Sequence, residues 1–242
     1  MLLMWHNSGR YNVGLRDKLI YLFAAVAGVL LVWNLYTMFY VLPDELNQGP
    51  VYRIFFFHVP SLFVGMIGLL LAMVASVGYL TVKDFRYDEA AAAMVEVALT
   101  FMIAGVVGGS IWARSTWGIW WTWDARLTST FACILLAAGY LMLRKAIEDP
   151  TARARLSAVL CIFAGVDVVI VWKSIEWFRT QHPAPVLAVR GGGGMAPGME
   201  AAMYWNFLAL GLLAAALVLM RMRQERIGRE IDALRRTLRE RE

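Results

Sequence analysis

The residues best suited to bind a ligand are four tryptophans, together with the acidic and basic residues that follow them. They lie in one run between two strongly apolar stretches: Trp117, Gly118, Ile119, Trp120, Trp121, Thr122, Trp123, Asp124, Ala125 and Arg126. A water-facing loop does not normally expose four indoles, because large apolar patches cost solubility. Indoles suit a flat apolar ligand, and they also suit a membrane–water interface. Both interpretations place this run at a membrane surface.

Two of the three histidines, His58 and His182, are candidates to act together with the tryptophans. His58 lies at the start of one apolar stretch and His182 lies shortly after another, and a proline that stiffens the backbone follows each closely. Two imidazoles beside a tryptophan surface could supply both axial ligands of a haem. Ordinary alternatives exist, because an interfacial histidine is usually a hydrogen-bonding loop residue and tryptophans often form an aromatic belt. An aromatic belt, however, spreads its residues over several helix ends. Four tryptophans within one short run therefore favour a ligand-binding surface.

A haem also carries two propionates, which need cationic partners at a membrane surface, and arginine matches carboxylates best. Arg126 follows Asp124 by two residues and Arg53 precedes His58 by five, so both are candidates; Arg114 and Arg179 are weaker ones. Asp124 itself has two open interpretations. It either orients a ligand-bearing segment or caps the helix that follows it.

The composition indicates a membrane protein, with 60% hydrophobic residues and a mean hydropathy of +0.58. A helix needs about 20 apolar residues to cross the hydrocarbon core. Six stretches come near or exceed this length: Leu19–Leu42, Val59–Val82, Ala91–Trp112, Thr128–Leu143, Leu156–Trp172 and Tyr204–Met222. The sequence therefore predicts an all-α, polytopic membrane protein with six transmembrane helices. Its six-span domain is expected over residues 1–225, and a basic amphipathic tail over 226–242.

The net charge of +5 reflects orientation in a membrane and does not indicate a nucleic-acid partner. Of the 23 lysines and arginines, 17 fall in the N-terminal arm, in two of the connections between spans and in the tail. By the positive-inside rule, both termini are predicted to be cytoplasmic. The tryptophan loop, taken as residues 113–127, is then outside, together with His58 and His182.

Other chemistries lack their motifs. Cys133 and Cys161 lie within apolar spans without CxxC spacing, so a disulfide framework or a structural zinc site is not expected. The glycine run Gly191–Gly194 lacks the Lys-Ser/Thr ending of a phosphate-binding loop. Gly105 and Gly109 form a GxxxG step, which predicts close packing of two spans.

The run Trp-Gly-x-Trp-Trp-x-Trp-Asp-x-Arg-Leu-Thr resembles the signature of the tryptophan-rich (WWD) haem-handling membrane proteins. With its six spans and with His58 and His182 in these positions, the chain is similar to the haem exporter protein C (CcmC) family over residues 15–225. The resemblance implies that His58 and His182 are the axial ligands of haem b. It also implies a binding surface on the motif residues, which are Trp117, Trp120, Trp121, Trp123 and Asp124.

The same resemblance implies a role and partners in bacterial cytochrome c maturation. Such a protein presents haem at the periplasmic face of the inner membrane to a haem chaperone (CcmE). It does so in contact with membrane lipid and within a complex of ATP-binding-cassette subunits (CcmA and CcmB) and a small subunit (CcmD). It is a carrier and presenter of haem, and any ATPase activity belongs to a partner.

Two alternatives remain at this point. A membrane b-type cytochrome would also use two histidines, for electron transfer, although such proteins usually keep them within spans and at paired depths. A structural transporter subunit would carry the aromatic residues as a belt only.

Overall fold

The computed structural model describes residues 14–182, 195 and 198–239, and the glycine run Gly191–Gly194 lies outside them. The described part is helical and contains no strand. The six long helices are α1 (Leu15–Tyr36), α2 (Phe55–Val82), α3 (Phe85–Trp117), α4 (Ala125–Ala146), α5 (Pro150–Trp177) and α6 (Met199–Arg239). Two short helices, η1 (Thr37–Val41) and η2 (Pro50–Ile54), lie between α1 and α2. Six helices are long and apolar enough to cross a membrane, which confirms the predicted fold class.

Several helices extend beyond the predicted apolar spans, because capping residues and not hydropathy determine where they end. Asp84, Asp124 and Asp149 are the N-caps of α3, α4 and α5, and each carboxylate accepts a hydrogen bond from a backbone N–H in the first turn. Helix α3 ends at Gly118, whose φ of 77° is in the left-handed region that favours glycine. The connection between α3 and α4 is therefore residues 118–124, shorter than the predicted loop 113–127.

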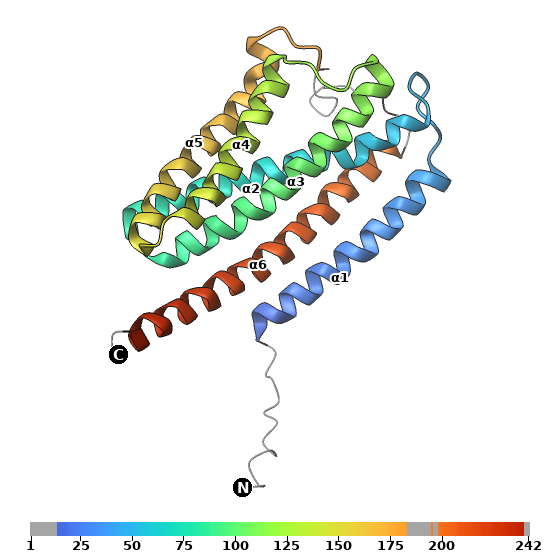
Figure 1. Ribbon diagram of the computed structural model, residues 1–242. Coiled ribbons are helices and arrows are strands. Elements are labelled where there is room, and N and C mark those ends of the chain that lie inside the picture. The colour runs from blue at the N-terminus through green and yellow to red at the C-terminus, as the bar shows by residue number, and fades with distance from the viewer. Residues whose placement is uncertain (1–13, 183–194, 196–197, 240–242) are drawn as a thin grey trace, which may run out of the picture.

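Helices α2 to α5 form one bundle, and α1 and α6 pack together along its side (Figure 1). Small residues allow α2 and α3 to approach closely. A Cβ atom added at Gly65 would lie 3.0 Å from the carbonyl oxygen of Ala98, and one added at Gly68 would lie 3.0 Å from the Ala98 side chain. The buried core of the bundle, which includes Met66 and Leu69, lies along this contact.

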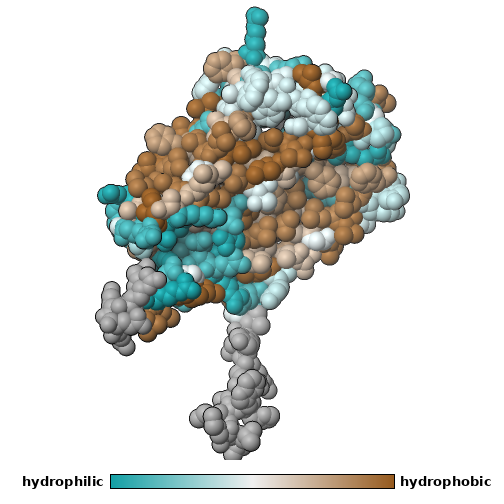
Figure 2. Space-filling model, viewed as in Figure 1, coloured by the Kyte–Doolittle hydropathy of each residue, from teal (hydrophilic) through white to brown (hydrophobic). Residues whose placement is uncertain are grey.

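The two ends of the bundle carry different segments. The 118–124 connection, the residues after α5 and the start of α2 lie at one end, and the start of α1 and the end of α6 lie at the other (Figure 1). A salt bridge of 2.8 Å from Arg223 Nη1 to Asp17 Oδ1 joins α6 and α1 there. An apolar band separates the hydrophilic surfaces of the two ends, as a membrane-spanning bundle requires (Figure 2). The assignment of the second end to the cytoplasm remains a prediction from the charge distribution.

Candidate binding pocket

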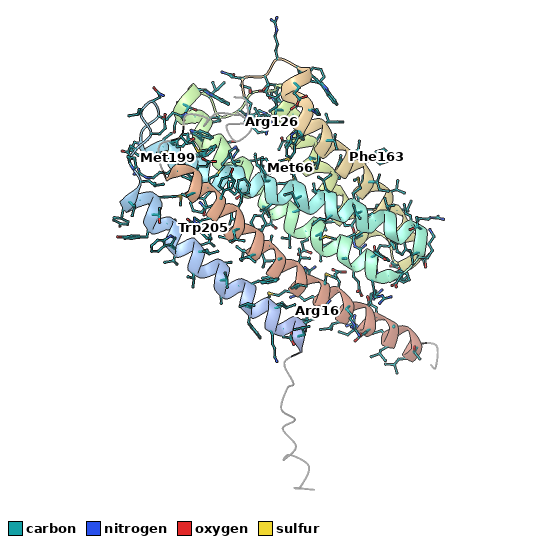
Figure 3. The ribbon with its side chains drawn as sticks, turned by 180° about the vertical axis from the view of Figure 1, so that it is seen from behind. Arg16, Met66, Arg126, Phe163, Met199 and Trp205 are labelled. Atoms are coloured by element: carbon teal, nitrogen blue, oxygen red, sulfur yellow. The ribbon has the colours of Figure 1, made fainter. Side chains whose placement is uncertain are left out.

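A pocket opens at the end of the bundle that carries the 118–124 connection. Six of the predicted site residues line it, and they come from α2, the end of α3, the connection, α4 and the segment after α5: His58, Trp117, Trp120, Trp121, Arg126 and His182. Figure 3 shows Arg126 at this end, opposite Arg16 near the start of α1. The fold therefore brings together residues that are as far apart in the sequence as His58 and His182.

His58 is buried and held in one orientation by α3. Its Nδ1 lies 2.8 Å from the carbonyl oxygen of Gly105, and because this oxygen only accepts, Nδ1 carries the proton. The neutral ring then has an unprotonated Nε2, which is the form that binds a metal. Gly109 makes room for the ring, since an added Cβ atom would contact Cε1 and would lie 2.7 Å from Nδ1. The two glycines of the GxxxG step thus position His58, and a Cβ atom added at Gly105 would lie 2.7 Å from Cγ of Leu62 in α2.

Trp112 and Gln48 are pocket residues that the sequence analysis did not identify. The indole of Trp112 packs edge-on against the His58 ring, with centroids 5.9 Å apart. Its Nε1 donates a hydrogen bond of 2.7 Å to Gln48 Oε1, which fixes the indole plane. A signal for Trp112 was present, because it follows Gly109 by three residues and so shares its helix face. Gln48 lies in the connection before α2 and carries no such signal.

Asp124 joins two sides of the pocket rim. Its Oδ1 accepts a hydrogen bond of 2.9 Å from the Leu127 N–H and caps α4. Its Oδ2 accepts hydrogen bonds from the Thr180 hydroxyl, at 2.6 Å, and from the Gln181 N–H, at 3.1 Å. The Thr180 oxygen in turn accepts one of 3.0 Å from the His182 N–H. The two roles that the sequence left open are therefore combined in one carboxylate.

The surroundings of Asp124 keep its carboxylate ionised. Burial raises the pKa, but hydrogen bonds from Leu127, Thr180 and Gln181 outweigh this effect, so the pKa lies below its ordinary value. An ionised carboxylate only accepts hydrogen bonds, and all three neighbours donate to it. The segment before His182 is therefore fastened to the start of α4 through a charged group.

The indoles of the tryptophan run differ in position. Trp120 is 58% exposed at the mouth of the pocket. Trp123 is 72% exposed and does not line the pocket; it packs edge-on against Trp121 and Phe131, with ring centroids 5.7 and 5.9 Å apart. The outer part of the run therefore presents an aromatic surface next to the opening.

The inner indoles form the wall of the pocket. Trp117 packs edge-on against the His182 ring, with centroids 6.5 Å apart. The Nε1 of Trp121 and the hydroxyl of Thr122 are buried and have no hydrogen-bond partner among the described residues. Buried donors are normally satisfied, so both groups are available to a bound molecule.

Arg126 brings a positive charge into a pocket that is otherwise mostly apolar. Its guanidinium takes part in none of the ion pairs or side-chain hydrogen bonds found within the described ranges. A partly buried cation without a partner is costly, and a carboxylate is the group that best matches its planar fork. The geometry therefore favours a ligand with an anionic group.

The other predicted arginines do not line the pocket. Arg53 is paired elsewhere, since its Nη2 lies 2.7 Å from Asp44 Oδ1 and its Nε donates a hydrogen bond of 2.7 Å to the Met38 carbonyl oxygen. Arg114 donates to the carbonyl oxygen of Gly118 at the end of its own helix. Arg179 precedes the segment that carries His182 but is not part of the pocket wall. Of the predicted cationic partners, the structure brings only Arg126 to the site.

The pocket has a volume of about 110 Å³. Sites that enclose a small molecule usually measure about 300–1,000 Å³. A large planar ligand would therefore be enclosed only in part and would extend past the exposed Trp120.

Fold and pocket together define a six-span helical membrane protein with an aromatic, histidine-bearing binding pocket at one end. The chain belongs to the haem exporter protein C family: the family model described as CcmC, Heme exporter protein C, matches residues 2–237. This confirms the resemblance noted from the tryptophan run.

Curated relatives agree with the family model. Heme exporter protein C of Bradyrhizobium diazoefficiens is 33% identical over 212 residues, which cover 87% of this chain and 80% of the relative. The protein of the same name from Escherichia coli K12 is 34% identical over 182 residues, or 75% of this chain and 73% of the relative. That of Paracoccus denitrificans is 31% identical over 205 residues, or 84% and 83%.

Proposed function

We propose that this chain binds haem b at one face of the membrane, with His58 and His182 as the axial ligands. Membership of the haem exporter protein C family supports a role in haem handling for cytochrome c maturation. The observation that carries the proposal is that both histidines line one pocket with tryptophans and with Arg126, which has no ion-pair partner among the described residues. Imidazoles, aromatic walls and a propionate partner are the groups that haem requires.

The surrounding residues position these groups. Gly105 and Gly109 fix the tautomer and the place of His58, so that Nε2 is available as a ligand. The hydrogen bonds from Asp124 through Thr180 hold the backbone of His182. Bound haem would supply the iron that both imidazoles ligate and the vinyl edge to which an acceptor is joined.

The shape of the pocket supports presentation of haem over its permanent storage. The pocket would enclose only part of a planar ligand; Trp120 is exposed where it lines the pocket, and Trp123 is exposed nearby, against Trp121. Membership of the haem exporter protein C family favours presentation over electron transfer, for which an exposed edge would also serve. We therefore infer that the chain hands haem to a haem chaperone (CcmE), at the periplasmic face of the bacterial inner membrane. Its proposed complex contains CcmA, CcmB and CcmD, with ATP hydrolysed by the partner subunits.

The test is the optical spectrum of the purified full-length protein with His58→Ala or His182→Ala. The unaltered protein should contain six-coordinate, low-spin haem, and each variant should lose this signature. Added imidazole should restore it in part by filling the vacated ligand position. His6→Ala is the matched control, because His6 lies in the N-terminal arm that is predicted to be cytoplasmic. If both single variants keep the unaltered spectrum, the ligand assignment is wrong.

A further inference from the structure

A second cavity, of about 450 Å³, lies at the opposite end of the bundle from the haem pocket. It is lined by residues at the start of α3, the end of α4 and the start of α5, and by the part of α6 that follows Met220. Figure 2 shows hydrophilic residues gathered at this end, next to the apolar band. Five basic side chains line it: Arg144, Lys145, Arg153, Arg221 and Arg229.

Three of the five are neutralised by carboxylates of neighbouring helices. The ion pairs are Arg144–Asp88 at 2.5 Å, Arg144–Glu225 at 3.7 Å, Arg221–Glu96 at 2.6 Å and Arg229–Glu89. These pairs fasten the extension of α6 to α3 and α4 and so hold the cavity in shape. Helix α6 has 41 residues, about twice what a membrane span needs, so its extension reaches past the hydrocarbon core.

Lys145 and Arg153 are different, because neither side chain takes part in an ion pair or hydrogen bond within residues 14–182, 195 and 198–239. The Nε of Arg153 is also buried, with no hydrogen-bond partner in the described part of the chain. The remaining acidic residue of the cavity, Asp232, already has a cation near it, with Arg235 Nη1 at 3.6 Å. Two unpaired cations from α4 and α5 thus face one cavity, and their mutual repulsion favours an anion between them.

We propose that this cavity binds a phosphate group, either in the headgroup of an acidic phospholipid or as a soluble phosphate. The planar fork of Arg153 and the flexible ammonium of Lys145 are the two groups that proteins use for phosphate oxygens. Basic pockets between membrane-spanning helices bind anionic headgroups where the apolar band ends. Ala92 and Leu141 also line the cavity, and these apolar groups favour the lipid over the soluble anion. No residue that lines this cavity also lines the proposed haem pocket.

The lipid arm of the experiment uses the full-length protein in nanodiscs of phosphatidylcholine, with and without phosphatidylglycerol. Lipid that remains bound after extraction is measured by mass spectrometry. In the second arm, inorganic phosphate is added to protein in pure phosphatidylcholine nanodiscs, and the rise in unfolding temperature is recorded. The variant is Lys145→Gln with Arg153→Gln. Each basic side chain near a membrane surface contributes roughly a factor of five in affinity, so binding should weaken roughly thirty-fold.

Arg155→Gln is the matched control, because Arg155 is an exposed residue of α5 that does not line the cavity. If the unaltered protein retains phosphatidylglycerol and the double variant does not, the cavity binds a lipid headgroup. If phosphate stabilises the unaltered protein but not the double variant, the cavity binds the soluble anion. If the double variant does not fold, Lys145→Gln alone should still lose roughly five-fold, since Lys145 is exposed and unpaired. Equal binding by the unaltered protein and the variants would overturn the proposal, as would an equal loss in Arg155→Gln.

Discussion

Replacement of Gly109 by alanine should weaken the proposed haem binding without unfolding the protein. The added Cβ atom would contact Cε1 of the His58 ring and would lie 2.7 Å from Nδ1. The ring cannot yield easily, because its Nδ1 is hydrogen-bonded to Gly105 and Trp112 packs against it. The imidazole must therefore turn away from the position in which its Nε2 is available as a ligand.

The magnitude follows from these contacts. Insertion of a methyl group into a well-packed interior costs about 1–3 kcal/mol. If the strain is relieved by moving His58, 1–3 kcal/mol corresponds to haem binding that is roughly five- to 150-fold weaker. Alanine also favours a helix by about 1 kcal/mol over glycine, so the folded protein should remain stable.

Gly108→Ala is the matched control for this substitution. It adds the same methyl group one position earlier in α3, where the nearest side-chain atom, Cγ2 of Ile54, would be 3.8 Å away. The assay is the haem content per purified protein, together with its optical spectrum. Gly108→Ala should match the unaltered protein, whereas Gly109→Ala should lose haem and the low-spin spectrum. Equal haem content in the two variants would refute the inferred role of Gly109 in positioning His58.

Three further predictions concern the rim of the pocket. Asp124→Asn keeps one acceptor oxygen, which is enough to cap α4, but its amide cannot also accept from Thr180 and Gln181. Because a hydrogen bond to a charged group contributes about 1.5–3 kcal/mol, the free energy of unfolding should fall by at least about that much and the haem content should fall with it. Unchanged haem content would contradict the proposed link to the His182 segment. Trp120→Ala should retain haem but load the chaperone poorly, because one indole adds only about 0.5–1.5 kcal/mol to haem binding beyond its buried area. A parallel loss of bound haem and of loaded chaperone would show that Trp120 serves to retain haem. Arg126→Gln should weaken haem retention about ten-fold or more, because a charge-assisted hydrogen bond contributes about 1.5–3 kcal/mol. Arg114→Gln is the control and should leave retention unchanged. Similar retention in both variants would contradict the role of Arg126 as a propionate partner.

The sequence by itself determined the architecture, because backbone groups in a bilayer must be satisfied within each segment. An apolar stretch that is long enough to cross the membrane is therefore a helix, and the structure has six such helices in the predicted order. The tryptophan run was recognisable for a similar reason: few soluble loops carry so many indoles. Both signals are local, and a local signal can be read from consecutive residues.

Contacts between distant segments could not be read in this way. Asp124 and Thr180 are 56 positions apart, and no spacing rule predicts that the carboxylate reaches that hydroxyl. Arg53 and Arg126 looked equivalent in the sequence, yet Arg53 is paired with Asp44 and only Arg126 lines the pocket. The helix directions and rotations that decide such contacts depend on how small residues such as Gly109 let neighbouring helices pack. Packing depends on all six helices at once, so the tertiary structure alone determined which of the predicted residues meet.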